Sequence, residues 1–201
     1  MGKTYSEIVA DQQNEITGHW FKNHRANFET FSPNLSTLTW REEGTLIFFV
    51  RYIFDGANMY ISGDLGEAVF RFTEKAVPER IAHYNLDYFC EKLRALNNPT
   101  RDFSCEYANE YLDMILKDYE DENVEYDKGA FAELRRIIDN STRVNDFHRE
   151  LYDFDYYRIG NDAWEWLSDI GSVIPMQLRA YLEGIKMAVA QIDTGGSSIE
   201  S

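Results

Sequence analysis

The segment Thr45–Phe72 reads TLIFFVRYIFDGANMYISGDLGEAVFRF and is rich in β-branched and aromatic residues. Apolar residues are almost continuous over 46–54, which is typical of a strand covered on both faces. Turn-forming residues follow at Asp55-Gly56-Ala57-Asn58 and again at Gly63-Asp64-Leu65-Gly66. The segment therefore predicts three antiparallel strands joined by two tight turns. In the second turn we expect structural roles for Gly63, Asp64 and Gly66.

Outside this segment, the periodicity predicts one more strand and several helices. Leu35–Arg41 is the fourth strand, and a capping box at Thr4 and Glu7 opens a helix expected over 5–27. Apolar stripes predict further helices over 86–96, 103–117, 128–139 and 144–151, a short one at Trp164 and Leu167, and a last one that begins near Pro175. The expected fold class is α+β, a small antiparallel meander of about four strands with an N-terminal helix and a helical C-terminal half.

The length of 201 residues fits a single domain. Within it we expect residues 1–101 to form helix, meander and helix, 102–193 an acidic helical subdomain, and 194–201 a flexible tail. The two cysteines, Cys90 and Cys105, lie on predicted helices beside apolar neighbours and are typical of reduced core residues. With no apolar run as long as a membrane span and no signal-peptide pattern, the sequence favours the cytoplasm.

The negative charge is concentrated in the second half of the chain. Residues 1–101 hold 11 Lys/Arg against 13 Asp/Glu, whereas residues 102–201 hold 9 against 22. Such a surface repels phosphates and attracts basic surfaces, so direct binding of DNA or RNA is not expected. The alternative interpretation is that the acidity only keeps the protein soluble.

Two acidic stretches are candidate interaction surfaces because carboxylates alternate with aromatic residues there. The predicted partner-binding residues are Asp118, Tyr119, Glu120, Asp121, Glu122, Glu125, Asp127, Glu150, Asp153, Asp155 and Tyr156. Both stretches could equally be solvated faces without a partner.

The sequence contains no catalytic or metal-binding signature. The four histidines are scattered, and the 118–127 stretch misses the calcium-loop spacing, so neither a metal nor a cofactor is expected. One enzymatic alternative remains, in which Asp64 and Glu67 hold magnesium for a reaction on nucleic acid or a nucleotide.

The motif GDLGEAVF at 63–70, followed by the helix LDYFCEKL at 86–93, resembles small acidic phage and prophage proteins of Gram-positive bacteria. These proteins have a GDLG-x-AV-F/Y hairpin and then a YF-x-x-K helix, and some phage proteins of this general appearance are anti-CRISPRs. The likeness spans about residues 47–96. It implies a phage-encoded anti-defence protein that acts in the cytoplasm of a bacterial host cell, and it assigns no functional residue.

Together, charge and resemblance predict a binding protein rather than an enzyme. The expected partner is a bacterial defence nuclease, a Cas effector, whose basic groove the acidic surface would occupy, which would block nucleic-acid binding or cleavage. The other alternative is a phage structural or assembly protein.

Overall fold

The computed structural model describes residues 3–196 and divides into two compact units. The helical unit consists of the residues up to Ala10 together with Arg101–Ile174. The sheet unit consists of Asp11–Thr100 together with the residues from Pro175 onward. The chain therefore leaves the sheet unit after Thr100 and returns to it at Pro175.

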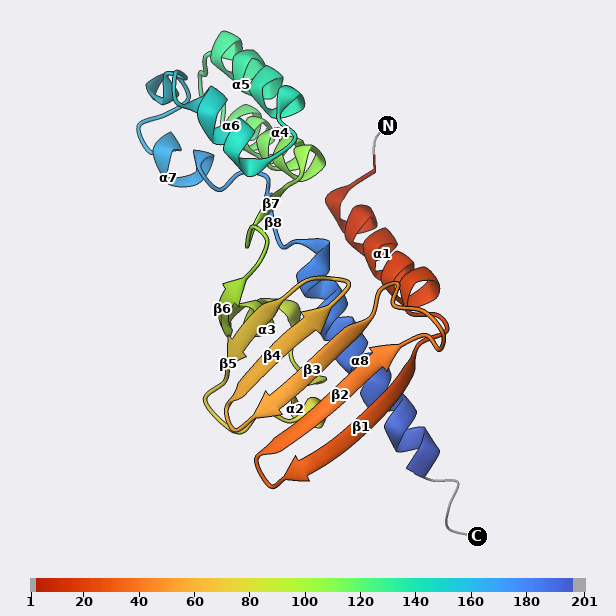
Figure 1. Ribbon diagram of the computed structural model, residues 1–201. Coiled ribbons are helices and arrows are strands. Elements are labelled where there is room, and N and C mark those ends of the chain that lie inside the picture. The colour runs from red at the N-terminus through yellow and green to blue at the C-terminus, as the bar shows by residue number, and fades with distance from the viewer. Residues whose placement is uncertain (1–2, 197–201) are drawn as a thin grey trace. The chain divides into compact units, whose positions relative to one another are not determined.

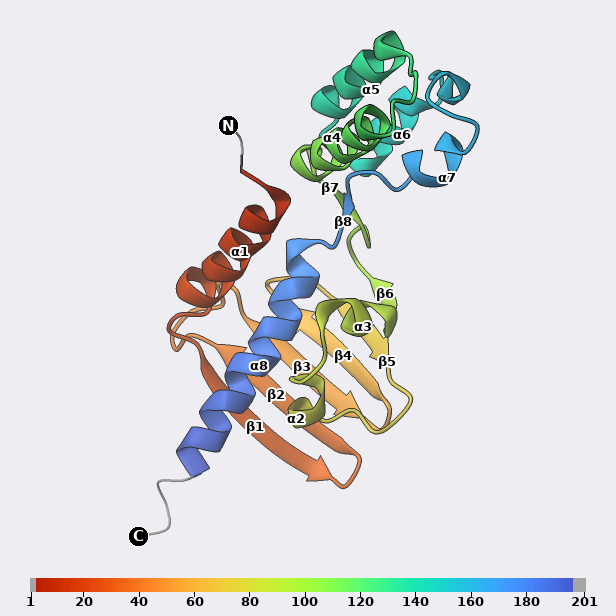
Figure 2. The ribbon, with the colours of Figure 1, turned by 180° about the vertical axis from the view of Figure 1, so that it is seen from behind.

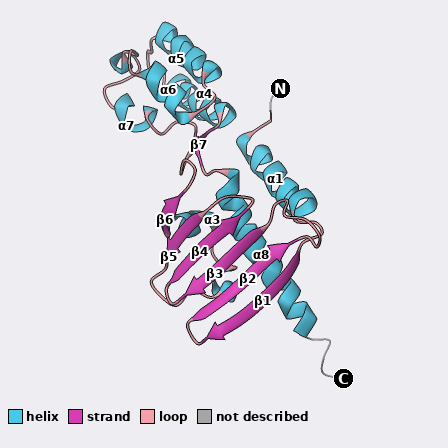
Figure 3. Ribbon diagram, viewed as in Figure 1, coloured by secondary structure: helices cyan, strands magenta, loops and turns pink. Residues whose placement is uncertain are grey.

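The sheet unit is built on six antiparallel strands, each paired with the next along the chain (Figures 1 and 3). The strands are β1 (Arg25–Ser32), β2 (Leu35–Arg41), β3 (Val50–Asp55), β4 (Asn58–Gly63), β5 (Ala68–Arg71) and β6 (Leu93–Leu96). Most connections are short turns, as expected for a meander. The one long connection, between β5 and β6, contains the helices α2 (Pro78–Ile81) and α3 (Leu86–Glu91).

One face of this sheet is covered by α2, α3 and the long last helix α8 (Met176–Gly196), which crosses it (Figure 2). Side chains alternate along the strands, so every second residue points toward these helices. The buried set is Leu38, Trp40, Val50, Tyr52, Phe54, Met59, Ile61, Ala68 and Phe70. Burial of each large side chain contributes roughly 1.5–3 kcal/mol, so this layer supplies a large part of the unit's hydrophobic stabilisation.

α8 approaches the sheet closely at Gly184. A Cβ atom built there would lie 2.5 Å from the hydroxyl oxygen of Tyr52, which itself donates a hydrogen bond of 2.9 Å to the carbonyl of Tyr181. Tyr52 is fully buried, and burial raises the pKa of its hydroxyl well above the usual value. Glycine is therefore needed in α8 because the backbone of the helix rests on a fixed side chain.

The turn Gly63-Asp64-Leu65-Gly66 is anchored on both sides. A carboxylate oxygen of Asp64 accepts a hydrogen bond of 2.8 Å from the amide of Phe48, while the carbonyl of Leu65 accepts hydrogen bonds from Gln177 (2.5 Å) and Tyr181 (3.0 Å). A Cβ atom at Gly63, where φ is +142°, would lie 2.2 Å from the carbonyl oxygen of Phe49. The turn thus joins the 45–49 loop to α8.

The helical unit contains α4 (Cys105–Asp121), α5 (Lys128–Asn140), α6 (Val144–Leu151), the 3₁₀ turn η2 (Tyr156–Arg158) and α7 (Ala163–Leu167). A short ribbon, β7 (Asp102–Phe103) paired with β8 (Ser172–Val173), closes it. Its core comprises Ala108, Leu112, Ala130, Phe131, Leu134, Ile137, Ile138, Phe147, Phe154, Ile159, Ala163, Leu167 and Ile170. These residues come from all five helical elements or their flanks, so the unit has a hydrophobic core of its own.

The α+β class is confirmed, but the predicted strand count of about four is wrong. The sheet has six strands, and the helical unit adds a two-stranded ribbon. The helix expected over 5–27 is shorter: α1 (Tyr5–Glu15) continues into a π-helical turn, η1 (Ile16–Trp20), and the chain then enters β1. The helix expected over 86–96 ends at Glu91, because the residues after it pair with β5. Pairing with a neighbouring strand overrides local helical spacing in both places.

The strand expected from Leu46 begins only at Val50. Phe48 has a positive φ of 55°, its amide is bound by Asp64, and its carbonyl oxygen lies 3.1 Å from Nε2 of His24. The 45–49 loop is thereby held outside the sheet, and the side chains of Leu46 and Ile47 are exposed. The apolar run was a misleading signal because tertiary hydrogen bonds hold this loop away from the strand ladder.

The last helix was expected to belong to the acidic helical subdomain of residues 102–193, yet it lies in the sheet unit. Residues 194–196, assigned to a tail, belong to α8, and 197–201 lie outside the described residues. Cys90 in α3 and Cys105 at the start of α4 form no disulfide. No helix within residues 3–196 is both long and apolar enough to cross a membrane.

Candidate functional site

Five of the predicted carboxylates lie together where α4 ends and the loop to α5 begins. This acidic junction consists of Asp118, Glu120, Asp121, Glu122 and Glu125, all with exposed side chains. The last turn of α4 holds no basic residue. Its carboxylates therefore face the negative end of the helix dipole and one another, an arrangement that is unfavourable in the absence of a cation.

Within the described part of the chain, these carboxylates have few partners. Only Glu120 accepts a side-chain hydrogen bond, a long one of 3.4 Å from the hydroxyl of Tyr126. No Lys or Arg of residues 3–196 lies within ion-pair distance of the acidic junction. The fold therefore does not use these charges, and they remain accessible to a partner.

Asp127 has a different role, because the fold itself uses its carboxylate. It caps α5 by accepting a hydrogen bond of 3.0 Å from the amide of Ala130, and it pairs with Nε of Arg158 at 3.0 Å. Arg158 also donates to Glu133 at 2.8 Å. The bond from Ala130 and then the guanidinium of Arg158 lower the pKa of Asp127. We assign Asp127 to the fold rather than to a binding surface.

The two tyrosines of the first stretch also contribute mainly to packing. Tyr119 and Tyr126 are half-buried, and the rings of both meet Phe131 edge-on, at centroid distances of 5.9 and 5.4 Å. Burial raises the pKa of Tyr119. A partner could therefore contact only the exposed part of each side chain.

The second predicted set is divided by the structure. Glu150 and Asp153 line a shallow hollow of about 370 Å³ together with Glu133, but Arg136 and Arg149 line it as well and offset two of the three negative charges. Asp155 caps η2 by accepting a hydrogen bond of 3.2 Å from the amide of Tyr157. This region carries less net negative charge than the sequence suggested.

The most accessible aromatic side chains of this region do not include Tyr156, the aromatic residue predicted to bind a partner. Tyr156 is half-buried against Tyr157, with ring centroids 4.4 Å apart, whereas Tyr152, Tyr157 and Trp164 are 88%, 65% and 60% exposed. Large exposed aromatic rings are typical of interaction surfaces. The sequence shows that aromatic residues are clustered in this segment, but it does not show which of the rings are exposed.

The residues of the enzymatic alternative are not assembled into a metal site. Asp64 is bound to the amide of Phe48, and no group of three or more His, Cys, Asp or Glu residues within the described part of the chain could hold a metal ion. Glu67 is exposed beside the same turn.

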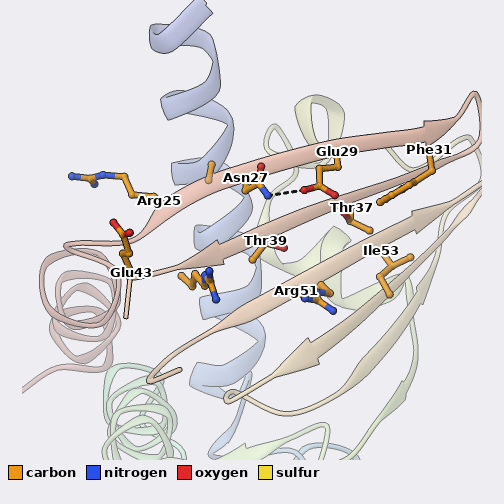
Figure 4. A pocket seen from close by; sticks show the side chains of 11 residues that line it. Arg25, Asn27, Glu29, Phe31, Thr37, Thr39, Glu43, Arg51 and Ile53 are labelled. Atoms are coloured by element: carbon orange, nitrogen blue, oxygen red, sulfur yellow. Dashed lines mark hydrogen bonds between the residues drawn. The ribbon is translucent and has the colours of Figure 1, made fainter. Parts of the chain in front are cut away.

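A second surface, the open face of the sheet, was not predicted from the sequence. A groove of about 550 Å³ there is lined by β1, β2 and β3 and includes Arg25, Arg41 and Arg51 (Figure 4). Because residues 25–27 were expected to end a helix, the alternation that places these arginines on one face was hidden.

The comparisons with known proteins add no family to these observations: no family model matches the chain, and no curated protein or solved structure is significantly similar to it.

Proposed function

We propose that this protein is a non-catalytic inhibitor that binds the basic nucleic-acid groove of a target enzyme through the acidic junction. The observation that carries the proposal is the cluster of five exposed carboxylates without a basic partner at the end of α4. Such a cluster is stabilised when lysines or arginines of another molecule approach it.

The distribution of charge between the two units supports the same proposal. The helical unit contains 9 Lys/Arg and 20 Asp/Glu, a net charge of −11, and the sheet unit contains 11 and 15, a net charge of −4. The helical unit would therefore be steered toward a positive groove. Carboxylates in that groove would compete with nucleic-acid phosphates, and the competition would weaken as salt screens it.

We further propose a bacterial defence nuclease, such as a Cas effector, as the target, and a bacterial host cell as the place of action. The resemblance of residues 47–96 to phage proteins supports this choice. The exposed rings of Tyr152, Tyr157 and Trp164, which belong to the same unit, would add apolar contact area.

The test is affinity capture from a bacterial host lysate at low and at high salt, with captured proteins identified by mass spectrometry. The variant carries Glu120→Lys, Asp121→Lys and Glu122→Lys. A matched control carries Glu79→Lys, Asp87→Lys and Glu91→Lys, three exposed residues of the sheet unit. Both variants change the formal net charge from −15 to −9. Circular dichroism verifies that both remain folded.

We expect capture of a nucleic-acid enzyme at low salt, its loss at high salt, and its loss from the junction variant but not from the control. Purified partner should then lose binding to its nucleic acid when this protein is added in stoichiometric amount. Equal loss of capture by both variants would show that net charge alone accounts for the effect, and it would refute a specific role of the acidic junction. Metal-dependent breakdown of the nucleic acid by this protein would favour an enzyme instead.

A further inference from the structure

The open face of the sheet is the strongest candidate for a second binding site. Helices α2, α3 and α8 cover the opposite face (Figures 1 and 2). On the open face, register places Arg25 opposite Arg41, and Asn27, Thr39 and Arg51 in the next row. Glu29, Thr37 and Ile53 form a third row. The groove described above follows these rows.

Three arginines lie in the first two rows at one end of this groove, but the guanidinium of Arg25 points outward and donates a hydrogen bond of 3.0 Å to the carbonyl of His24 (Figure 4). Arg25 and Arg41 are direct cross-strand neighbours, with Cβ atoms expected about 4.5–5.5 Å apart, and Arg51 is the diagonal neighbour of Arg41, about 7–8 Å away. Like charges at such positions destabilise a sheet. Among residues 3–196 no carboxylate lies within ion-pair distance of any of them. The positive charges of these arginines therefore repel one another, and a bound anion would relieve that repulsion.

The other end of the groove is apolar. Phe31 is 62% exposed and lies at the far end from Arg25, with Ile53 and Thr37 on the way to it (Figure 4). Phe31 is six positions after Arg25 along the chain, a span of about 20 Å. The described residues that line this half include no Lys or Arg.

Hydrogen-bonding groups lie between the two ends. Nδ2 of Asn27 donates to a carboxylate oxygen of Glu29 at 2.9 Å, and Thr37 and Thr39 supply hydroxyl groups. Glu29 also lines this middle part, and Glu43 lies at the arginine end (Figure 4), so the ionised side chains of the groove sum to +1 in a protein of formal net charge −15. A polar middle between a cationic end and an apolar end would orient a ligand that has the complementary order of groups.

We propose that this groove binds a mononucleotide, with its phosphate on Arg41 and Arg51 and its base toward Ile53 and Phe31. A guanidinium group can bind two phosphate oxygens at once, and the two positive charges of Arg41 and Arg51 match a dianionic phosphate. The sugar would lie between the phosphate and the base, near the side chains of Asn27 and Thr39. A nucleic-acid strand fits less well, because its evenly spaced phosphates would meet arginines in one half of the groove only.

Binding is tested by titration calorimetry with adenosine, guanosine, cytidine and uridine 5′-monophosphates, inorganic phosphate, adenosine, and a short oligothymidine. The variant is Arg41→Gln with Arg51→Gln. The matched control is Arg71→Gln, an exposed arginine that register places on the same open face but that does not line the groove. Loss of two charge-assisted contacts should weaken the affinity by a factor of about ten or more, and the control should change it by less than about twofold. Phe31→Ser should weaken mononucleotide binding and leave phosphate binding unchanged.

Saturable binding of at least one mononucleotide, tighter than that of phosphate or adenosine, is the expected result. Thermal melting gives an independent check, since removal of like charges should leave the double variant at least as stable as the parent protein. Absence of binding by all four mononucleotides, equal loss in the Arg71 control, or binding of the oligonucleotide alone would overturn the proposal. The acidic junction is unchanged in these variants, so the outcome is independent of the inhibitor proposal.

Discussion

Replacement of Gly184 by alanine tests how α8 rests on the sheet. In an exposed helix, Gly→Ala stabilises by about 1 kcal/mol. Here the added methyl carbon would lie 2.5 Å from the Tyr52 hydroxyl oxygen, 3.3 Å from Cδ1 of Trp40 and 3.4 Å from Cε2 of Phe21. All three rings are fully buried, so none can rotate into solvent.

The magnitude follows from two costs and one gain. Overpacking of a filled core costs about 1–3 kcal/mol, and displacement of the Tyr52 hydroxyl from the Tyr181 carbonyl costs about 1–3 kcal/mol more. The helix propensity of alanine offsets about 1 kcal/mol. We therefore expect Gly184→Ala to lower the free energy of unfolding by about 1–5 kcal/mol, measured by urea denaturation. The control is Gly18→Ala, at an exposed glycine whose added Cβ would have no neighbour within 4 Å.

A double-mutant cycle with Tyr52→Phe gives the decisive comparison. The phenylalanine lacks the oxygen that the new methyl group would meet, so Gly184→Ala should cost clearly less in that background. Additive effects, or a Gly184→Ala variant as stable as the Gly18→Ala control, would refute the proposed contact.

Two further predictions concern the loop that holds Phe48. Asp64→Ala should lower the free energy of unfolding by about 1–3 kcal/mol because the Phe48 amide loses its acceptor, and Asp64→Asn should recover part of the loss. Urea denaturation of both variants measures the effect, and equal stability of both variants and the parent protein would contradict a structural role. Burial lowers the pKa of His24 below its usual 6.5, so the unfolded chain binds a proton that the folded chain resists. Stability should therefore fall as the pH is lowered from about 7 through 6.5, and His24→Gln should flatten this slope; a slope identical to that of the parent protein would disprove the assignment.

Helices with an amphipathic stripe were predictable from the sequence alone. The stripes around Leu112, Leu134 and Phe147 predicted α4, α5 and α6 to within a few residues, because each helix closes its own hydrogen bonds and buries one face. The strands β2, β4 and β5 were likewise close to expectation, since turn residues bound them and their polarity alternates.

The two outer strands could not be predicted in this way. In β1 and β6 no residue is fully buried, so neither carries the hydrophobic pattern that identifies a strand. Their backbone groups are satisfied by β2 and β5, which lie at a distance that local sequence does not encode. The position of α8 on the sheet depends in the same way on contacts between segments more than a hundred residues apart.

The sequence by itself determined the α+β class, the acidic character of the second half and the carboxylates of the junction, because composition and helical periodicity are local properties. Tertiary structure alone decided which of those carboxylates serve the fold, as Asp127 and Asp155 do, and which remain available. It also brought Arg25, Arg41 and Arg51 together on one open face. That grouping requires a strand register, and a register exists only once the strands have paired.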